Sequence, residues 1–255
     1  MSAVLSISNL NQSFGGVRAI DDFHLNVEQE SIHGLIGPNG AGKTTVFNVI
    51  TGIYRPRSGS ALFRGCELIG RKPFEIANMG VGRTFQNIRL FPMLSVLENV
   101  IIAGHRDAGY SFVEALTHLG RYRRIVRAQC DHARGLLATV GLEHREREQA
   151  GSLPYGLQRR LEIARALALK PSLLLLDEPA AGMNEEESLA LVSFIREIQK
   201  KFSLTILMIE HHMDVVTSLC HDITVLNFGR ILAQSSDIAE IKKNPAVVEA
   251  YLGKE

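Results

Sequence analysis

The chain has 255 residues with a formal net charge of +1, and 45% of its residues are hydrophobic and 22% charged. This composition is typical of a globular protein with a sizeable core. The small net charge excludes a strong overall electrostatic attraction to nucleic acid or anionic membranes. Cys66, Cys130 and Cys220 stand too far apart for a metal cluster, so we expect reduced thiols, as in a cytosolic protein. No apolar run reaches the roughly 18 residues of a membrane span, and the first residues lack a signal-peptide pattern.

The first part of the chain alternates between apolar and polar residues. VLSISNL, AIDDFHLNV and SIHGLIG predict short strands of an antiparallel or mixed sheet. The segment KTTVFNVITG then predicts a helix that Gly52 closes. Ser95 with Glu98 forms a capping box, so a helix is expected from Val96, and the polar, helical texture up to about Gln149 indicates a helical insertion.

The second part has the pattern of an α/β protein. SLLLLDEP and LTILMIEHH predict strands buried on both faces of a parallel sheet. Between them, Asn184 with Glu187 predicts a helix start, followed by a stripe that faces the core: Leu191, Val192, Ile195 and Ile198. ITVLNFGRILAQ predicts a hairpin around Phe228-Gly229, and Asn244-Pro245 predicts a final helix that Gly253 ends.

The segment GPNGAGKT, Gly37 to Thr44, fits G-x-x-x-x-G-K-S/T and lies between a predicted strand and a predicted helix. Glycines allow backbone N–H groups to turn inward and surround an anion, and the helix N-terminus adds partial positive charge. Lys43 is placed to reach the β- and γ-phosphates, and the Thr44 hydroxyl is a candidate Mg²⁺ ligand. The sequence therefore predicts a phosphate-binding loop.

Polar residues follow the two buried strands. Asp177 ends the first and can hold Mg²⁺ through water, while Glu178 points to the opposite face and can orient an attacking water. His211 ends the next strand, where it is either a γ-phosphate contact or a solvated loop residue; His212 is expected to be the latter. Phe14 either stacks on a base or joins the core of the β flank, and Gln86 can carry Mg²⁺ or water.

These segments, in this order along essentially the whole chain, resemble the ATP-binding subunits of ABC transporters. In that family GPNGAGKTT is the Walker A motif, LLLLDEP the Walker B strand and AGMN, ending at Asn184, the D-loop. The resemblance implies an α/β fold: a P-loop NTPase core of mostly parallel sheet flanked by helices, with an antiparallel β flank and a helical subdomain. It implies a single ABC ATPase domain over residues 1–255, with its core at 1–86 and 165–255 and its helical subdomain at approximately 87–164.

The resemblance also implies functional roles for individual residues. Glu178, His211 and Lys43 are expected to be catalytic, and Thr44, Gln86 and Asp177 to hold Mg²⁺. The expected ATP contacts are Phe14, Gly37, Pro38, Asn39, Gly40, Ala41, Gly42, Lys43, Thr44, Thr45 and Gln86.

The family's signature motif, L-S-G-G-Q in its common form, contacts the ATP held by the opposite subunit. Its residues here are Leu153, Pro154, Tyr155, Gly156 and Leu157. Gly156 and the helix start are kept, but the serine hydroxyl and the glutamine are absent. Proline suits a first helical turn. Pro154 and Leu157 therefore bear on the partner's ATP site, leaving this chain's own site intact.

Within the family, RTFQNIRLFPMLSVLENV, RRLEIARAL and NPAVVEAYLG resemble the larger ATPase of the branched-chain amino acid importer. The implied function is ATP hydrolysis that powers amino acid uptake, with ATP and Mg²⁺ as cofactors. Implied partners are a paralogous ATPase (or a second copy of this chain), two membrane-spanning permease subunits and, indirectly, a substrate-binding protein. The implied location is peripheral, on the cytoplasmic face of the plasma (inner) membrane.

Two other functions are weighed against this one. A soluble ABC ATPase of DNA repair or translation usually carries a long coiled-coil arm or two fused ATPase domains, and this sequence has neither. A phosphotransferase is disfavoured because Glu178 and His211 suit water as the acceptor. The basic run from Arg121 to Arg134 lacks interleaved aromatic residues apart from Tyr122, so we expect a solvated helix face and no nucleic acid.

Overall fold

The structure is a computed structural model that describes residues 3–105 and 121–252. Two compact units are present. Unit 1 consists of Met1–Gln86 and Ser172–Glu255, and unit 2 of Asn87–Pro171. The return to unit 1 comes later than the predicted residue 165, because that residue lies inside a helix, α6 (Tyr155–Leu167), that belongs to unit 2. In the described part of the chain, no helix is long and apolar enough to cross a membrane.

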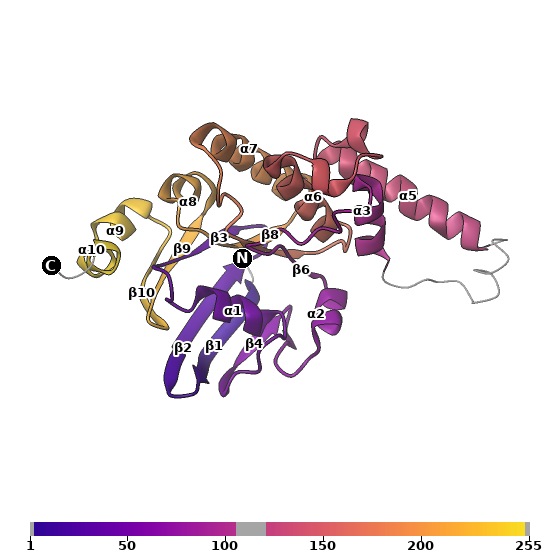
Figure 1. Cartoon of the computed structure of the whole chain (residues 1–255). Coiled ribbons are helices and arrows are strands. Elements are labelled where there is room, and N and C mark those ends of the chain that lie inside the picture. The colour runs from indigo at the N-terminus through magenta and orange to yellow at the C-terminus, as the bar shows by residue number, and fades with distance from the viewer. Residues whose placement is uncertain (1–2, 106–120, 253–255) are drawn as a thin grey trace. The chain divides into compact units, whose positions relative to one another are not determined.

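Unit 1 contains an antiparallel sheet of four strands in the order β2-β1-β4-β5 (Figure 1). Its strands are β1 (Ala3–Phe14), β2 (Val17–Glu28), β4 (Ser58–Phe63) and β5 (Cys66–Glu67). The first two strands are longer than predicted, and the last two were not predicted. They were missed because glycines and charged residues interrupt the alternation between residues 58 and 67.

The second sheet of unit 1 has six strands in the order β10-β9-β3-β8-β7-β6. Four neighbouring pairs are parallel and only β10 runs antiparallel to β9. The strands are β3 (Ile32–Ile36), β6 (Val81–Arg83), β7 (Leu173–Asp177), β8 (Thr205–Ile209), β9 (Asp222–Asn227) and β10 (Arg230–Ser235). The buried strands and the hairpin are confirmed. The prediction that grouped SIHGLIG with the first two strands is wrong, because every residue of β3 is buried and the strand pairs with β8 and β9.

Helices of unit 1 follow or connect these strands. They are α1 (Lys43–Ile50), α2 (Pro73–Met79), α7 (Glu185–Phe202), α8 (Met213–Leu219), α9 (Ile238–Lys243) and α10 (Pro245–Leu252). The capping box of Asn184 with Glu187 at the start of α7 is confirmed, and so is the buried stripe. The short helices α2, α8 and α9 were not predicted, and Gly253, the expected end of α10, lies outside the described residues.

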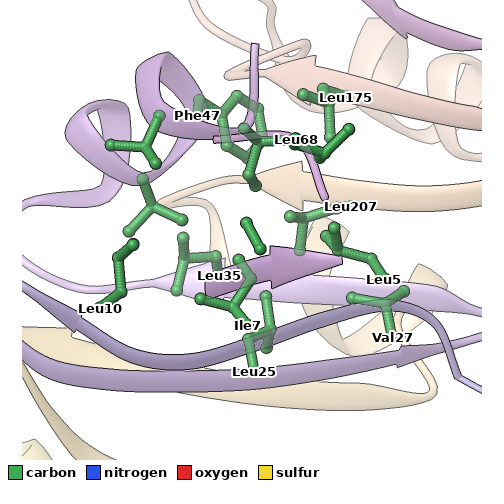
Figure 2. Close-up of a cluster of buried hydrophobic side chains, with 14 of the residues drawn as sticks. Leu5, Ile7, Leu10, Leu25, Val27, Leu35, Phe47, Leu68, Leu175 and Leu207 are labelled. Carbon is green, nitrogen blue, oxygen red and sulfur yellow. The ribbon is translucent and has the colours of Figure 1, made fainter. Parts of the chain in front are cut away.

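The core of unit 1 joins both sheets through α1. Phe47 of α1 is fully buried and lies in a cluster with Leu25 of β2, Leu35 of β3 and Leu175 of β7 (Figure 2). Fully burying side chains of this size stabilises a fold by about 1.5–3 kcal/mol each. This packing fixes the start of α1 against the carboxyl end of β3, which is where the predicted phosphate loop lies.

Unit 2 is built from helices. They are α3 (Val96–Gly104), α5 (Arg121–Thr139) and α6, with short 3₁₀ turns at Glu143–Arg145 and Ala150–Ser152. The capping box of Ser95 with Glu98 is confirmed, with Ser95 Oγ accepting from Glu98 N at 3.2 Å. Buried Asn99 accepts a hydrogen bond from Phe91 N at 2.9 Å and donates one to Ser95 O at 3.0 Å. One side chain thereby holds the segment that enters α3.

His33 makes the stability of unit 1 dependent on pH. His33 is the second residue of β3, and its Nε2 lies 2.8 Å from Thr224 Oγ1. Burial lowers the pKa of His33 to about 4, against the opposing charge of Asp222. The unfolded chain takes up this proton near pH 6.5 while the folded chain does not, so stability falls as the pH drops from about 6.5 towards 4.

We therefore expect the unfolding free energy to fall by about 2 kcal/mol from this residue alone between pH 7.5 and pH 5. Urea unfolding at the two pH values measures it. His33→Gln should make the two midpoints more alike, whereas His144→Gln, at a solvent-exposed site, should leave the difference as in the parent. An unchanged pH dependence in His33→Gln would show that this histidine is not the cause.

Candidate functional site

The loop between β3 and α1 has a backbone that only glycine allows at two positions. Gly37 has φ 148° and Gly42 has φ 108°. A Cβ at Gly37 would lie 2.0 Å from Leu226 O, and one at Gly42 would lie 2.5 Å from Ala19 O. The loop is thus closely packed against neighbouring backbone on both sides. Its N–H groups and the start of α1 suit an anion such as phosphate.

Lys43 is the first residue of α1 and its side chain turns back over the loop. Nζ donates to Gly37 O at 2.6 Å and to Pro38 O at 2.9 Å. Only 6% of the residue is exposed. Burial lowers the pKa of the Lys43 ammonium below its usual range, while the carboxylates of Glu178 and Asp177 oppose that shift. The ammonium is therefore a desolvated cation, held inside the loop where a phosphate would bring negative charge.

A cavity of about 250 Å³ opens beside this loop within unit 1. It brings together residues that are far apart in sequence, and all but one of them were predicted as site residues. They are Ala19, Asn39, Gly40, Ala41, Gly42, Lys43, Thr44, Thr45, Gln86 and Glu178. Ala19 was missed because a small apolar residue in β2 gives no chemical signal. Gly37, Pro38 and Phe14 are not among the residues that line this cavity.

Glu178 lies between two polar side chains at the carboxyl ends of the parallel strands. Gln86 Nε2 donates to Glu178 Oε2 at 2.8 Å, and His211 Nδ1 lies 4.0 Å from the same oxygen. Glu178 has φ 48°, a strained conformation for a residue other than glycine, and its N–H donates to Ile209 O at 2.9 Å. A strained backbone that aims a carboxylate at a cavity is frequent in active sites.

Asp177, the last residue of β7, is buried and is paired with Arg83 at the end of β6. Arg83 Nη2 lies 2.9 Å from Asp177 Oδ2, and Asp177 N donates to Thr84 Oγ1 at 3.3 Å. Sequence reasoning missed Arg83. No local pattern marks an arginine whose partner lies 94 residues further along the chain.

Phe14, at the end of β1, is 42% exposed and is not part of the core. Its ring packs edge-on against Tyr54, with the ring centroids 5.0 Å apart. The alternative that placed Phe14 in the core of the β flank is therefore wrong. The exposed Phe14 ring, supported by Tyr54, offers an apolar face on which a base can stack. Tyr54 was not predicted to take part.

A second carboxylate, Glu210, organises the loops that follow β7 and β8. It is fully buried, and its Oε1 accepts a hydrogen bond from Ala180 N at 2.8 Å. Its Oε2 accepts from His211 N at 3.0 Å and lies 3.2 Å from His212 Nδ1. Sequence reasoning overlooked Glu210, although an acid directly before His211 and His212 in a buried strand was a usable signal. His212, the N-cap residue of α8, is therefore bonded to this carboxylate while its side chain stays 40% exposed; that it has no role at the phosphate stays a prediction.

The predicted signature residues lie in unit 2, at the start of α6. Pro154 occupies the N-cap position, so the helix begins one residue later than a first-turn proline would place it. Leu157 N and Gln158 N both donate to Pro154 O at 3.0 Å. The N–H groups that open a helix have no acceptor within it and suit an anion. Leu153 is buried and Tyr155 is exposed.

Sequence reasoning also missed the charge pair behind this loop. Arg159 is fully buried and donates from Nη1 to Glu162 Oε2 at 2.8 Å. Its Nη2 donates to the Tyr155 hydroxyl at 3.2 Å. The arginine thereby ties the exposed tyrosine to the buried face of α6.

The arrangement in unit 1 defines a class of protein. Phosphate groups suit the loop that Lys43 completes, and strand-end carboxylates beside it suit a metal ion and an attacking water. This combination is the site of a P-loop nucleoside triphosphatase. Comparisons with known proteins narrow the class further.

The family model described as "ABC transporter" matches residues 20–181. BraF of Pseudomonas aeruginosa and LivG of Escherichia coli, both named high-affinity branched-chain amino acid transport ATP-binding proteins, are each 42% identical to this chain over 251 residues. Each match covers 98% of both sequences. The ADP conformation of MJ1267, an ATP-binding cassette of an ABC transporter, superposes with a TM-score of 0.86 at 30% identity and covers 100% of both chains.

The chain belongs to the ABC transporter family, as an ATP-binding subunit with ATPase activity. The expected P-loop NTPase fold is confirmed. A soluble ABC ATPase of DNA repair or translation is not favoured by these relatives.

We expect Lys43→Ala and Glu178→Gln to fail at different steps. Lys43 compensates phosphate charge in the bound state, so its loss should weaken ATP binding. Glu178→Gln should keep binding and reduce turnover by about 10²–10⁴, because the carboxylate acts on water only during the reaction. Stopped-flow binding of ATP, measured beside steady-state hydrolysis, separates the two steps. Near-parental turnover in Glu178→Gln would contradict the role given to this residue.

Phe14→Ala should weaken ATP binding, because a stacked base contributes about 1–3 kcal/mol to the affinity of such sites. The expected increase in the dissociation constant for ATP is about tenfold, with little change for inorganic triphosphate, which has no base. Phe74→Ala, a change at another exposed phenylalanine, is the control. Equal loss of affinity for ATP and triphosphate in Phe14→Ala would rule out stacking.

Proposed function

We propose that this chain hydrolyses MgATP to power an importer of branched-chain amino acids. The observation that carries this proposal is its likeness to BraF and LivG, which extends over 98% of each sequence and is not confined to the ATP site. The surfaces that would meet other subunits lie within that range. Since a transported amino acid would not contact this chain, its identity is inferred from the proteins that resemble the chain throughout.

In the proposed reaction, Gly37, Pro38 and the residues up to Thr45 hold the phosphates. Lys43 compensates the charge of the β- and γ-phosphates, Glu178 orients the attacking water and His211 contacts the γ-phosphate. The 2.8 Å hydrogen bond from Gln86 to Glu178 supports a role for both side chains at one point of the cavity.

The candidate metal ligands are the Thr44 hydroxyl, the Gln86 amide oxygen and the Asp177 carboxylate. All three are hard oxygen donors, which Mg²⁺ prefers, and nitrogen or sulfur ligands are absent from this set. When held by these residues, Mg²⁺ would supply positive charge that neutralises the negative charge developing on the phosphates during hydrolysis. Asp177 is held in place by Arg83 through one carboxylate oxygen, so its other oxygen remains for the metal, directly or through a bound water.

The proposed working unit contains two ATPase subunits. Residues Leu153 to Leu157 of this chain would contact the ATP held by the opposite subunit, which is a paralogous ATPase or a second copy of this chain. Two membrane-spanning permease subunits, and indirectly a substrate-binding protein, complete the assembly. The chain would then lie on the cytoplasmic face of the inner membrane as a peripheral subunit, with no role for nucleic acid.

Unit 2 is proposed as the helical subdomain that meets the permeases, and unit 1 as the catalytic core. Phe91 and Met93 support this proposal, because they lie shortly after Gln86 and are 46% and 76% exposed. Large apolar side chains that are exposed together favour a protein contact. The same segment would transmit closure of the ATP site to the permeases through Gln86.

Purification of the tagged chain from gently solubilised membranes tests the proposed assembly. The expected result is recovery of two multi-spanning subunits and a second ATPase, and reconstitution of that complex with its binding protein should give ATP-dependent uptake of leucine, isoleucine or valine. Recovery of ribosomes or nucleic acid in their place would overturn the proposal. Uptake of another solute class, with these amino acids excluded, would overturn the substrate assignment alone.

In a heterodimer, Pro154 predicts two unequal ATP sites. The site completed by Leu153-Pro154-Tyr155-Gly156 lacks the serine hydroxyl, and one preorganised donor of this kind is worth about 10²–10³ in rate at an oxyanion site. The effect should be smaller here, because helix N–H groups at the start of α6 remain. Glu178→Gln in this chain should therefore reduce turnover more than the equivalent change in the partner.

Pro154→Ser should in turn speed the partner-side site, and Leu157→Gln should add to that gain. Hydrolysis is measured in reconstituted assemblies that carry one mutant subunit at a time. If the two glutamate substitutions reduce hydrolysis equally and Pro154→Ser does not increase it, the backbone of the signature loop alone acts on the ATP and the side chain at position 154 is immaterial.

A further inference from the structure

Arg83 joins the helix after the phosphate loop to the strand that carries Asp177. From the end of β6, its Nη1 donates to Asn48 Oδ1 at 2.7 Å and to Thr51 Oγ1 at 3.1 Å, both on the helical segment that begins at Lys43. Its Nη2 donates to Asp177 Oδ2 at 2.9 Å. A single guanidinium therefore bonds to two elements that are separate in sequence.

Aromatic rings and burial fix the plane of this guanidinium. The Arg83 Cζ atom lies 5.5 Å from the centre of the Phe47 ring and 4.9 Å from the centre of the Phe85 ring. The Arg83 side chain is only 7% exposed, and that of Asp177 only 4%. Because a guanidinium is planar and its N–H groups form a rigid fork, contacts at its edge and on its face leave it little freedom.

The two elements that Arg83 joins are the ones that carry two of the proposed metal ligands. Thr44 lies in the first turn of α1, and Asp177 is the last residue of β7. The spacing between their oxygens depends on how α1 sits against β7. Asn48 lies one helical turn beyond Thr44 on the same helix, so a bond from Arg83 to Asn48 constrains the element that presents the Thr44 hydroxyl.

We propose that Arg83 is a positioning residue that sets the spacing between Thr44 and Asp177 and thereby makes the site prefer Mg²⁺ to the larger Ca²⁺. The inference rests on the metal role proposed above for these two residues. Mg²⁺ requires near-octahedral oxygen ligands at about 2.0–2.1 Å, whereas Ca²⁺ accepts about 2.3–2.6 Å in flexible geometry. A rigid pair of ligands therefore favours Mg²⁺, and a loosened pair favours it less.

Comparing the affinities for Mg²⁺ and Ca²⁺ distinguishes an effect on ligand position from an effect on charge or on folding. Both ions carry two charges, so removing a guanidinium alters the electrostatic attraction of both to a similar extent. General destabilisation of the fold would also weaken both complexes alike. Only a change in the spacing or rigidity of the ligands alters the ratio of the two affinities.

The experiment measures the affinity of the full chain for a fluorescent, non-hydrolysable ATP analogue in Mg²⁺, in Ca²⁺ and in EDTA. Arg83→Met should weaken the Mg²⁺ complex about tenfold, the lower end of the usual cost of losing the partner of a metal ligand. The Ca²⁺ complex should weaken by no more than about threefold, because its geometry is more flexible. Binding in EDTA should not change.

Two further variants keep the test decisive if Arg83→Met folds poorly, which thermal melting reports. Arg83→Lys retains the charge but lacks the planar fork of N–H groups that bonds to Asn48 and Asp177 at once. Its ratio of Mg²⁺ affinity to Ca²⁺ affinity should therefore lie between those of the parent and Arg83→Met. Asn48→Ala leaves the Arg83–Asp177 pair intact and removes the shorter of the two bonds from Arg83 to the helical segment that begins at Lys43, so it should also lower the ratio of the Mg²⁺ affinity to the Ca²⁺ affinity. Arg159→Met is the matched control, since it breaks a buried ion pair in unit 2 and should leave the ratio unchanged.

Asp177→Asn distinguishes the two ways in which the proposal can fail. If Asp177→Asn keeps the parental difference between Mg²⁺, Ca²⁺ and EDTA, the metal role of Asp177 is wrong and the inference falls with it. If Asp177→Asn abolishes the Mg²⁺ preference while Arg83→Lys and Asn48→Ala both retain it, Asp177 holds the metal but Arg83 does not position it.

Discussion

The site depends on the parallel register of β3, β8 and β7, which brings the carboxyl ends of the three strands to the same height. Leu35 pairs with Ile209, and Ile209 pairs with Asp177, so three strands end at one edge of the sheet. The phosphate loop follows the first strand, His211 the second and Glu178 the third. Carboxyl ends of parallel strands place such loops side by side whatever their distance in sequence. A shift of one residue in this pairing would exchange the faces of the sheet to which Asp177 and Glu178 point.

At this end of the sheet, each buried positive charge is paired with nearby acceptors. Lys43 is held by loop carbonyl groups and Arg83 by Asp177, so each buried cation has acceptors close by. Breaking a buried pair on one side leaves a charge without compensation, at a typical cost of about 3–5 kcal/mol. The proposed chemistry and stability are therefore linked here, because Asp177, a proposed metal ligand, is also the charge partner of the buried Arg83.

Much of the fold could be predicted because its signals are local. The phosphate loop, the strands ending at Asp177 and Ile209, and both capping boxes depend on neighbouring residues alone. The parts that were missed depend on long-range contacts. Arg83 has acceptors at Asn48, Thr51 and Asp177, spread over much of the chain, and β6 is three residues long. The hydrogen bond between Gln86 and Glu178 was not predicted, because the two residues lie 92 positions apart and no local pattern links them.

Glu210 has a consequence for how the loops of unit 1 respond to one another. Its two oxygens receive N–H groups from the segment after β7, at Ala180, and from the segment after β8, at His211 and His212. An amide at this position would offer one acceptor in place of two and would direct its own N–H groups at donors, so glutamine is a poor substitute. The segment that leads to Asn184 and the one that carries His211 thus share a single anchor. A displacement of either loop would therefore strain its hydrogen bonds to the same carboxylate, which couples the positions of the two loops.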